Sequence, residues 1–164
     1  MGKAANSSIS LKQIHVTDNF WNKYVHLVKD VIIPYQWDIL NDKLEDVETS
    51  HCIENFKIAA GEKEGEFQGA VFQDTDVAKW LEAVGFVLNY ERDEKLEELA
   101  DETIELIGRA QQPDGYLNTY FTIKEPDGRW SNLMEGHELY TAGHMIEAAV
   151  ACLLYTSPSP RDRG

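Results

Sequence analysis

Apolar side chains recur at three- and four-residue spacing over much of this 164-residue chain, a pattern typical of amphipathic helices. The first helix is expected to follow Thr17, Asp18 and Asn19, a polar cluster that offers an N-cap. Its apolar positions are Phe20, Tyr24, Leu27, Val28, Val31 and Ile32. Pro34 should kink or restart this helix, because proline has no backbone N–H to donate. A shorter helix is predicted after residue 52, closed by Gly61.

Two longer helices are predicted in the middle of the chain, the first after residues 74–76 and the second after Asp93, which suits an N-cap. The first has its apolar stripe at Val77, Trp80, Leu81, Val84 and Leu88, and the second at Leu96, Leu99, Ala100, Thr103, Ile104, Ile107 and Ala110. The short break at Arg92 and Asp93 predicts an αα-hairpin. A further helix from His137 would open the next hairpin. The predicted fold is therefore all-α, and successive hairpins of this kind build an α/α toroid.

The segment between these helices is rich in turns and aromatic residues. Gln111 to Gly115 (QQPDG) ends one helix, since Pro113 cannot continue it and Asp114-Gly115 is a turn dipeptide. The aromatic residues that follow are Tyr116, Tyr120, Phe121 and Trp130. They suit either a pocket wall, where flat rings can stack on sugar faces, or a cap on the helical core. Residues 116–123 also have the β-branched and aromatic content of one short β-hairpin arm.

Two histidines lie on one stripe of the helix that begins near His137. His137 occupies the first turn, where a side chain can point into a cavity at the helix mouth or into water. His144 lies two turns later and is expected to be a buried, hydrogen-bonded core residue. The pair is spaced too far apart for two metal ligands on one helix, which usually sit three or four residues apart.

Acidic side chains near predicted helix ends could supply a general acid and base. These residues are Asp74, Asp76, Asp114, Glu135 and Glu138. The structural interpretation is favoured for each of them: Asp74 and Asp76 suit capping positions, Asp114 suits a turn, and Glu138 suits the positive end of a helix dipole.

The charge and amino-acid composition exclude several kinds of binding partner and cellular location. The net charge of −14 argues against nucleic acid and anionic membrane, because both would repel the chain. No apolar run reaches the length of about 18 residues that a transmembrane helix needs. The start of the sequence has no apolar stretch typical of a secretory signal. The two cysteines do not make a disulfide framework, so a cytoplasmic location is expected.

Several motifs, taken in order and spacing, closely resemble glycoside hydrolase family 127. They are PYQW at 34–37, NFKIAAG at 55–61, GEF at 65–67, FQD at 72–74, KWLEA at 79–83, residues 110–121, HELY at 137–140 and AGH at 142–144. The likeness runs from about residue 20 to residue 151. It implies an incomplete (α/α)6 toroid and a parent enzyme that removes β-L-arabinofuranose from oligosaccharides with retention. The parent is expected to be a homodimer.

The resemblance also implies a chemistry that this chain does not complete. In the family a zinc-bound cysteine is the nucleophile, a glutamate is the general acid/base, and further cysteines and a glutamate hold the zinc. These residues fall downstream of the matched motifs, so no catalytic residue, bound zinc or turnover is expected here. The substrate contacts that the resemblance implies are His137 and Gln36, with Asp74 of the FQD motif a weaker candidate. Cys52 matches no zinc ligand and is expected to be a small buried residue.

The sequence divides into three parts. Residues 1–17 are expected to be a loose lead-in, 18–151 the N-terminal part of the toroid, and 152–164 a non-native tail. The tail, CLLYTSPSPRDRG, resembles the translation of a sequencing-library adapter, and its Ser-Pro-Ser-Pro run cannot extend a helix. Two alternatives to the arabinofuranosidase remain: a non-catalytic helical binding module, and a related toroid enzyme such as an unsaturated-uronyl hydrolase.

Overall fold

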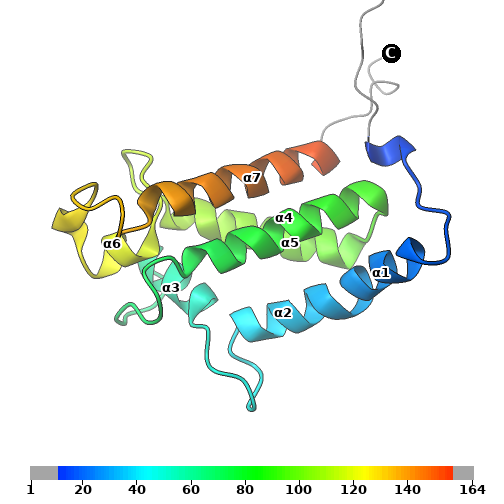
Figure 1. The fold of residues 1–164 in the computed structure, drawn as a ribbon. Helices are drawn as coiled ribbons and strands as arrows, with labels where there is room; N and C mark the ends of the chain where they lie inside the picture. The colour runs from blue at the N-terminus through cyan, green and yellow to red at the C-terminus, as the bar shows by residue number, and fades with distance from the viewer. Residues whose placement is uncertain (1–10, 157–164) are drawn as a thin grey trace, which may run out of the picture.

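The computed structural model describes residues 11–156, which are helical and contain no β-strand. The elements are η1 (Leu11–Gln13), α1 (Trp21–Leu27), η2 (Val28–Ile32), α2 (Ile33–Leu40), α3 (Cys52–Ala59), α4 (Asp74–Tyr90), α5 (Glu94–Ala110), α6 (Thr119–Ile123), η3 (Pro126–Gly128) and α7 (Glu138–Thr156). In Figure 1, α4 lies between α7 and the run of α1 and α2, with α5 behind it. The all-α prediction is confirmed, and the arrangement fits part of an α/α toroid.

The core is an apolar cluster centred on α4 and shared with its neighbours. Its buried members are Ile33, Leu40, Cys52, Ile53, Phe56, Val77, Ala78, Trp80, Leu81, Val84, Leu88, Ala100, Leu106, Ala110, Ala148 and Cys152. Trp80, expected in the core, stacks on Trp37 with ring centroids 4.4 Å apart and donates its indole N–H to the carbonyl of Ile33 at 3.1 Å. None of the helices formed by residues 11–156 combines the length and apolar character that a membrane-spanning helix needs.

The first long helix passes through Pro34 without a restart. Residues 21–40 form one helical run in which the turn Val28–Ile32 widens to a π-helix, and the N–H of Ile33 bonds the carbonyl of Val28. A widened turn can accommodate the missing N–H of proline one residue later. The predicted cap is confirmed, because Asp18 Oδ1 accepts from the backbone N–H groups of Phe20 and Trp21 at 3.0 and 2.7 Å.

The predicted αα-hairpin is confirmed by α4 and α5. Asp93 is the N-cap of α5 and accepts from the N–H groups of Lys95 and Leu96 at 3.2 and 3.1 Å. α3 ends as expected at a left-handed glycine, Gly61, whose φ is +74°. The most extensive helix–helix contact within residues 11–156 is between α4 and α7.

The short β-hairpin arm expected within 116–123 is wrong. Residues 119–123 form the helix α6, because Asn118 is an N-cap whose side chain accepts from the N–H of Phe121 at 3.1 Å. One polar cap therefore overrides the strand preference of the β-branched and aromatic residues behind it.

α7 extends beyond Ala151, where the sequence predicted its end. Cys152 is buried in the core, and the hydroxyl of Tyr155 donates to Asp101 Oδ1 on α5 at 3.3 Å. α7 packs chiefly against α4, and the apolar cluster that includes Cys152 continues the helix to Thr156. The lead-in is described only from residue 11, and the Ser-Pro run of the tail lies outside the described residues. The adapter origin of 152–164 stays a prediction.

Candidate substrate-binding site

A concavity of about 700 Å³ lies between α2 and α4. Its polar lining residues are Gln36, Glu48, Thr49, Ser50, Gln73, Asp76 and Lys79. Apolar residues such as Ile33 and Trp80 form its base. Gln36, predicted to contact substrate, therefore faces a space large enough for a sugar ring.

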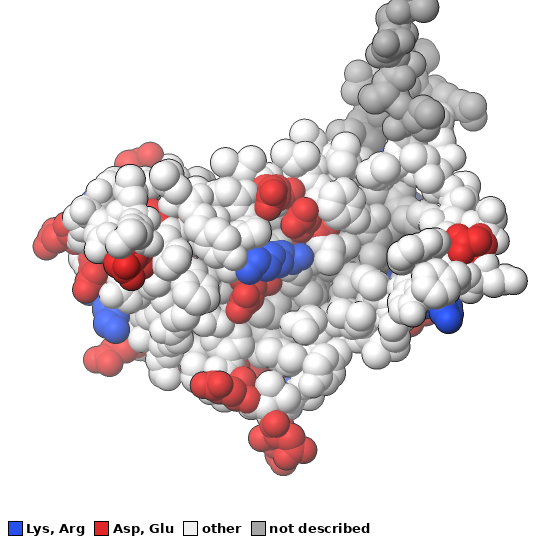
Figure 2. All heavy atoms as spheres, in the orientation of Figure 1, with Lys and Arg blue, Asp and Glu red and all other residues white. Residues whose placement is uncertain are grey.

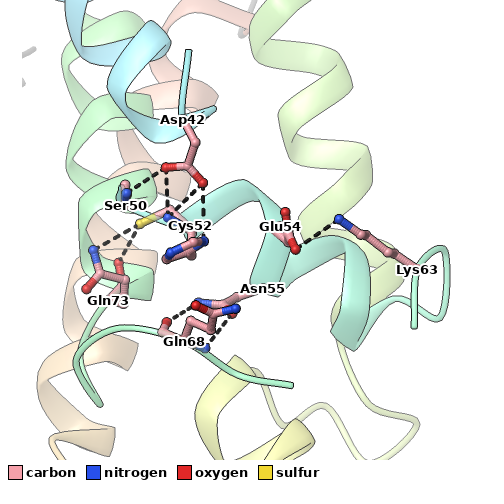
Figure 3. A network of polar contacts seen from close by, with 9 residues as sticks. Asp42, Ser50, Cys52, Glu54, Asn55, Lys63, Gln68 and Gln73 are labelled. Atoms are coloured by element: carbon pink, nitrogen blue, oxygen red, sulfur yellow. Dashed lines mark hydrogen bonds and ion pairs between the residues drawn. The ribbon is translucent and has the colours of Figure 1, made fainter. Parts of the chain in front are cut away.

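A polar network fixes the loop that closes this cavity (Figure 3). Asp42 has a left-handed backbone, with φ +56°, and its carboxylate accepts from the N–H of Ser50 at 2.6 Å and of His51 at 3.0 Å. The thiol of Cys52 donates to the carbonyl of Gln73 at 3.2 Å, and the amide of Gln73 donates back to the sulfur at 3.4 Å. Residues 42–51 are thereby joined to the first turn of α4.

Cys52 has the structural role that the sequence predicted. Its side chain is completely buried at the start of α3. Burial raises the pKa of this thiol to about 12, against weaker lowering by its hydrogen bonds. The group is therefore a neutral thiol near pH 7, and a neutral thiol is a poor nucleophile and a poor zinc ligand.

His137 stands where the loop turns into α7. Its backbone is left-handed, with φ +50°, and its carbonyl accepts from the N–H of Thr141 at 2.9 Å. The half-buried ring packs edge-on against Phe72, at 5.2 Å between centroids, and against Tyr140, at 6.0 Å. His137 does not line the cavity of Gln36. The first turns of α4 separate the two side chains, so these residues flank α4 on either side.

Glu138 is more deeply placed than the helix-dipole interpretation suggested. It is only 2% exposed, and its carboxylate accepts from the hydroxyl of Tyr116 and from the backbone N–H of Trp130 at 2.8 Å. Arg129 lies 4.1 Å above the ring of Tyr116. Burial, and then the bond to Glu138, raise the pKa of Tyr116 above its usual range. This cluster ties residues 116 and 129–130 to the start of α7, beside His137.

The aromatic loop contributes both to the helical core and to the wall of a cavity. Tyr116 and Phe121 are buried and close one end of the helical core, whereas Trp130 is half exposed. Tyr116 and Trp130 also line a second cavity of about 240 Å³ with Glu138. No sequence spacing linked Tyr116 to Glu138, because the contact joins residues on opposite sides of a long loop.

Asp74 lies inside the fold, and it lines neither of these cavities. The side chain is 2% exposed, and its two oxygens accept from the backbone N–H and the hydroxyl of Thr119 at 2.7 and 2.5 Å. Asp74 thus ties the start of α4 to the start of α6, and not to the N–H groups of its own helix as predicted. This geometry supports a structural role, and its contact with substrate stays a prediction that the cavity does not support.

The buried carboxyl of Asp74 should make stability depend on pH. Burial raises its pKa from 3.8 to about 6, against lowering by the bonds from Thr119. Between these pH values the folded chain binds more protons than the unfolded chain, so this contribution to the unfolding free energy is largest below about pH 4 and is lost as pH rises through 6. The loss should be on the order of 3 kcal/mol.

Asp74→Asn measures this effect, because asparagine keeps the shape but does not titrate. Relative to this variant, the wild-type chain should gain stability as the pH falls from 7.5 to 4.5. Thermal unfolding followed by circular dichroism checks the difference, and Glu98→Gln, an exposed carboxylate on α5, is the control. A wild-type-minus-variant difference that is flat over this range would show that Asp74 is ionised normally.

The metal-ligating groups within residues 11–156 do not fit the zinc site that the resemblance implies. Two groups bring three ligand atoms within 4.8 Å of one another: Asp42, His51 and Glu54, and Glu82, His144 and Glu147. Neither contains a thiolate. Glu54 forms an ion pair with Lys63 at 2.9 Å, and His144 Nδ1 lies 3.0 Å from a carboxylate oxygen of Glu147. The expected buried, hydrogen-bonded core position of His144 is wrong, because this residue is half-buried and lies beside Glu147 on its own helix.

Comparison with known proteins agrees with this architecture. The family model described as the β-L-arabinofuranosidase, GH127 catalytic domain matches residues 13–159. A non-reducing end β-L-arabinofuranosidase of Bifidobacterium longum subsp. longum is 42% identical over 84% of this chain, which spans only 23% of that relative.

Two solved structures superpose on most of the chain. One is a GH127 β-L-arabinofuranosidase from Geobacillus stearothermophilus T6, with 63% identity and a TM-score of 0.85 over 87% of this chain and 22% of that one. The other is a GH127 β-arabinofuranosidase, with 32% identity and a TM-score of 0.79 over 90% of this chain and 24% of that one. By the extent of the family match and these superpositions, the chain belongs to glycoside hydrolase family 127.

Proposed function

We propose that this chain forms part of the substrate-binding wall in the toroid of a retaining glycoside hydrolase that removes β-L-arabinofuranosyl residues from glycans. The observation that carries the proposal is the placement of Gln36 and His137. In a chain of this family, Gln36 lines the 700 Å³ cavity and His137 stands at the mouth of the adjoining helix. An amide and an imidazole can each hydrogen-bond a hydroxyl or ring oxygen.

The chemistry itself is assigned to residues outside this chain. By resemblance, a zinc-bound cysteine attacks the sugar and a glutamate acts as acid and base. Since neither described cysteine fits that role, the 164-residue chain should show no turnover by itself. Its contribution is to bind and orient the sugar. A cytoplasmic location and a dimeric parent stay predictions.

A chimera tests the function. Residues 13–156 of this chain would replace the matching segment of the Geobacillus stearothermophilus enzyme, whose 63% identity favours correct packing. The chimera should hydrolyse an aryl β-L-arabinofuranoside. His137→Ala should then lower kcat/KM about tenfold or more, the loss of roughly 1.4 kcal/mol of binding to the transition state.

Two further variants separate the imidazole from its backbone. His137→Asn should lose as much activity as the alanine variant, because asparagine tolerates the left-handed conformation but has no imidazole. His26→Ala, a histidine exposed on α1, should leave the kinetics unchanged. Wild-type kinetics in both His137 variants would remove this residue from the site. A chimera that folds without hydrolysing the glycoside would favour the binding-module alternative.

The uronyl hydrolase alternative has no comparable support. The family match and both superpositions point to arabinofuranosidases. A pair of catalytic aspartates would also be required, and in the described chain Asp74 is enclosed by its bonds from Thr119 and does not line the cavity beside Asp76.

A further inference from the structure

The exposed side of α4 joins the two predicted sugar contacts. Gln73, Asp76 and Lys79 are spaced three residues apart, so they share one face of the helix start. All three line the cavity with Gln36. Within the described residues, the side chains of Asp76 and Lys79 make no bond to a residue of the apolar core cluster, and the sequence predicts no substrate contact for them.

Asp76 and Lys79 have hydrogen-bonding capacity that the fold does not use. The side chain of Asp76 is 48% exposed and that of Lys79 is 44% exposed. Asp76 Oδ2 accepts from the amide of Gln73 at 3.1 Å, and its Oδ1 lies 3.9 Å from Lys79 Nζ. Lys79 also donates to Thr75 Oγ1 at 3.2 Å. A carboxylate has about four acceptor sites and an ammonium has three donors, so each group can still bind a ligand.

The same polar pair continues toward His137. Lys79 Nζ lies 5.4 Å from the ring centre of Tyr140, and that ring lies 6.0 Å from His137. Tyr140 therefore lies between Lys79, which lines the cavity with Gln36, and His137. Figure 2 shows a basic side chain with acidic side chains around it near the centre of this face, in front of α4 as drawn in Figure 1.

The chemistry of this pair suits a neutral sugar. A hydroxyl group both donates and accepts, so two neighbouring hydroxyls can donate to one carboxylate while one of their oxygens accepts from an ammonium. The opposite charges of Asp76 and Lys79 offset each other, so the pair does not favour an anionic ligand. Partial burial raises the pKa of Asp76, against lowering by Lys79, which agrees with a carboxyl partly shielded from water.

We propose that Asp76 and Lys79 form a subsite that binds two neighbouring hydroxyl groups of the glycoside in the cavity. Asp76 accepts from the hydroxyls and Lys79 donates to an oxygen of the same pair. The subsite deepens the proposed function and rests on it. Gln73 orients the carboxylate through its bond to Asp76 Oδ2.

The chimera with an aryl β-L-arabinofuranoside tests the subsite. Asp76→Asn and Lys79→Met should each raise KM about tenfold while kcat changes less than about threefold, because binding is lost equally in the ground state and the transition state. Glu98→Gln and Lys95→Met, which remove the same charges from exposed positions on α5, should leave KM unchanged. Circular dichroism melts establish that each variant is folded.

Two charge-conserving variants test the subsite even if Asp76→Asn or Lys79→Met fails to fold. Asp76→Glu and Lys79→Arg should raise KM about threefold, since the charge is kept and the geometry is altered. Wild-type KM in the Asp76 and Lys79 variants of an active chimera would overturn the subsite and leave the proposed function intact. A folded chimera with no activity would contradict the proposed function, and the subsite with it.

Discussion

Glu138→Ala should lower the unfolding free energy of the chain by about 3 kcal/mol, because a buried hydroxyl and a partly buried backbone N–H lose their shared acceptor. The carboxylate is enclosed by the hydroxyl of Tyr116 and the N–H of Trp130, which come from distant parts of the loop. Alanine can accept from neither. Urea denaturation followed by circular dichroism measures the loss, and Glu98→Ala, at an exposed position on α5, should cost less than about 0.5 kcal/mol.

Conservative variants separate the charge of Glu138 from its hydrogen bonds. Glu138→Gln keeps one acceptor and should cost less than alanine. Tyr116→Phe leaves a carboxylate oxygen buried without its donor, which is also unfavourable. In the double variant the two losses should not add, because the residues are in direct contact. Additive losses would show that the bond between Tyr116 and Glu138 contributes little to stability.

Gly85→Ala should also destabilise the chain, by about 2 kcal/mol or more. A Cβ at Gly85 of α4 would lie 2.8 Å from the backbone carbonyl carbon of Ala151 in α7 and 3.0 Å from its Cβ. Backbone atoms within a helix cannot move alone, so α7 would have to shift as a unit. This cost should exceed the gain of about 1 kcal/mol that alanine brings to a helix interior.

Gly108→Ala is the matched control for this substitution. Gly108 lies in α5, and a Cβ there would meet nothing within 4 Å. The same change should therefore stabilise the chain by about 0.5 to 1 kcal/mol. Opposite signs for the two variants in urea denaturation are the expected result. If Gly85→Ala stabilises the chain, the backbones of α4 and α7 are farther apart at Gly85 and Ala151 than they are in the structure.

Local features of the fold could be predicted from the sequence, since their causes lie within a few residues. The apolar stripes of α4 and α5 and the caps Asp18 and Asp93 depend on helical spacing and on side chains next to the helix start. The two errors have different causes. The helix α6 begins at the local cap Asn118, whereas the continuation of α7 past Ala151 depends on the burial of Cys152 in the core.

The candidate site was less predictable, because its parts meet only in the folded chain. Only a family resemblance points to Gln36 and His137, and the structure places them on either side of α4. The bonds of Asp74 to Thr119 and of Glu138 to Tyr116 join residues far apart in sequence. No periodicity reveals such partners. Gln73, Asp76 and Lys79 follow one another at a three-residue spacing that can be read from the sequence. The same polar spacing is common at solvent-exposed helix starts, so it does not indicate a binding site.

The widened turn at Val28–Ile32 makes the orientation of the residues after it sensitive to the length of this segment. One residue added to or removed from a helix rotates everything beyond it by about 100° around the axis. The direction in which Gln36 points is thus set by the number of residues upstream, more than by their identity. Substitutions between residues 28 and 32 should be accommodated far more readily than a one-residue deletion. The deletion would turn the side-chain amide of Gln36 out of the concavity, although the helix propensity of the remaining residues would be unchanged.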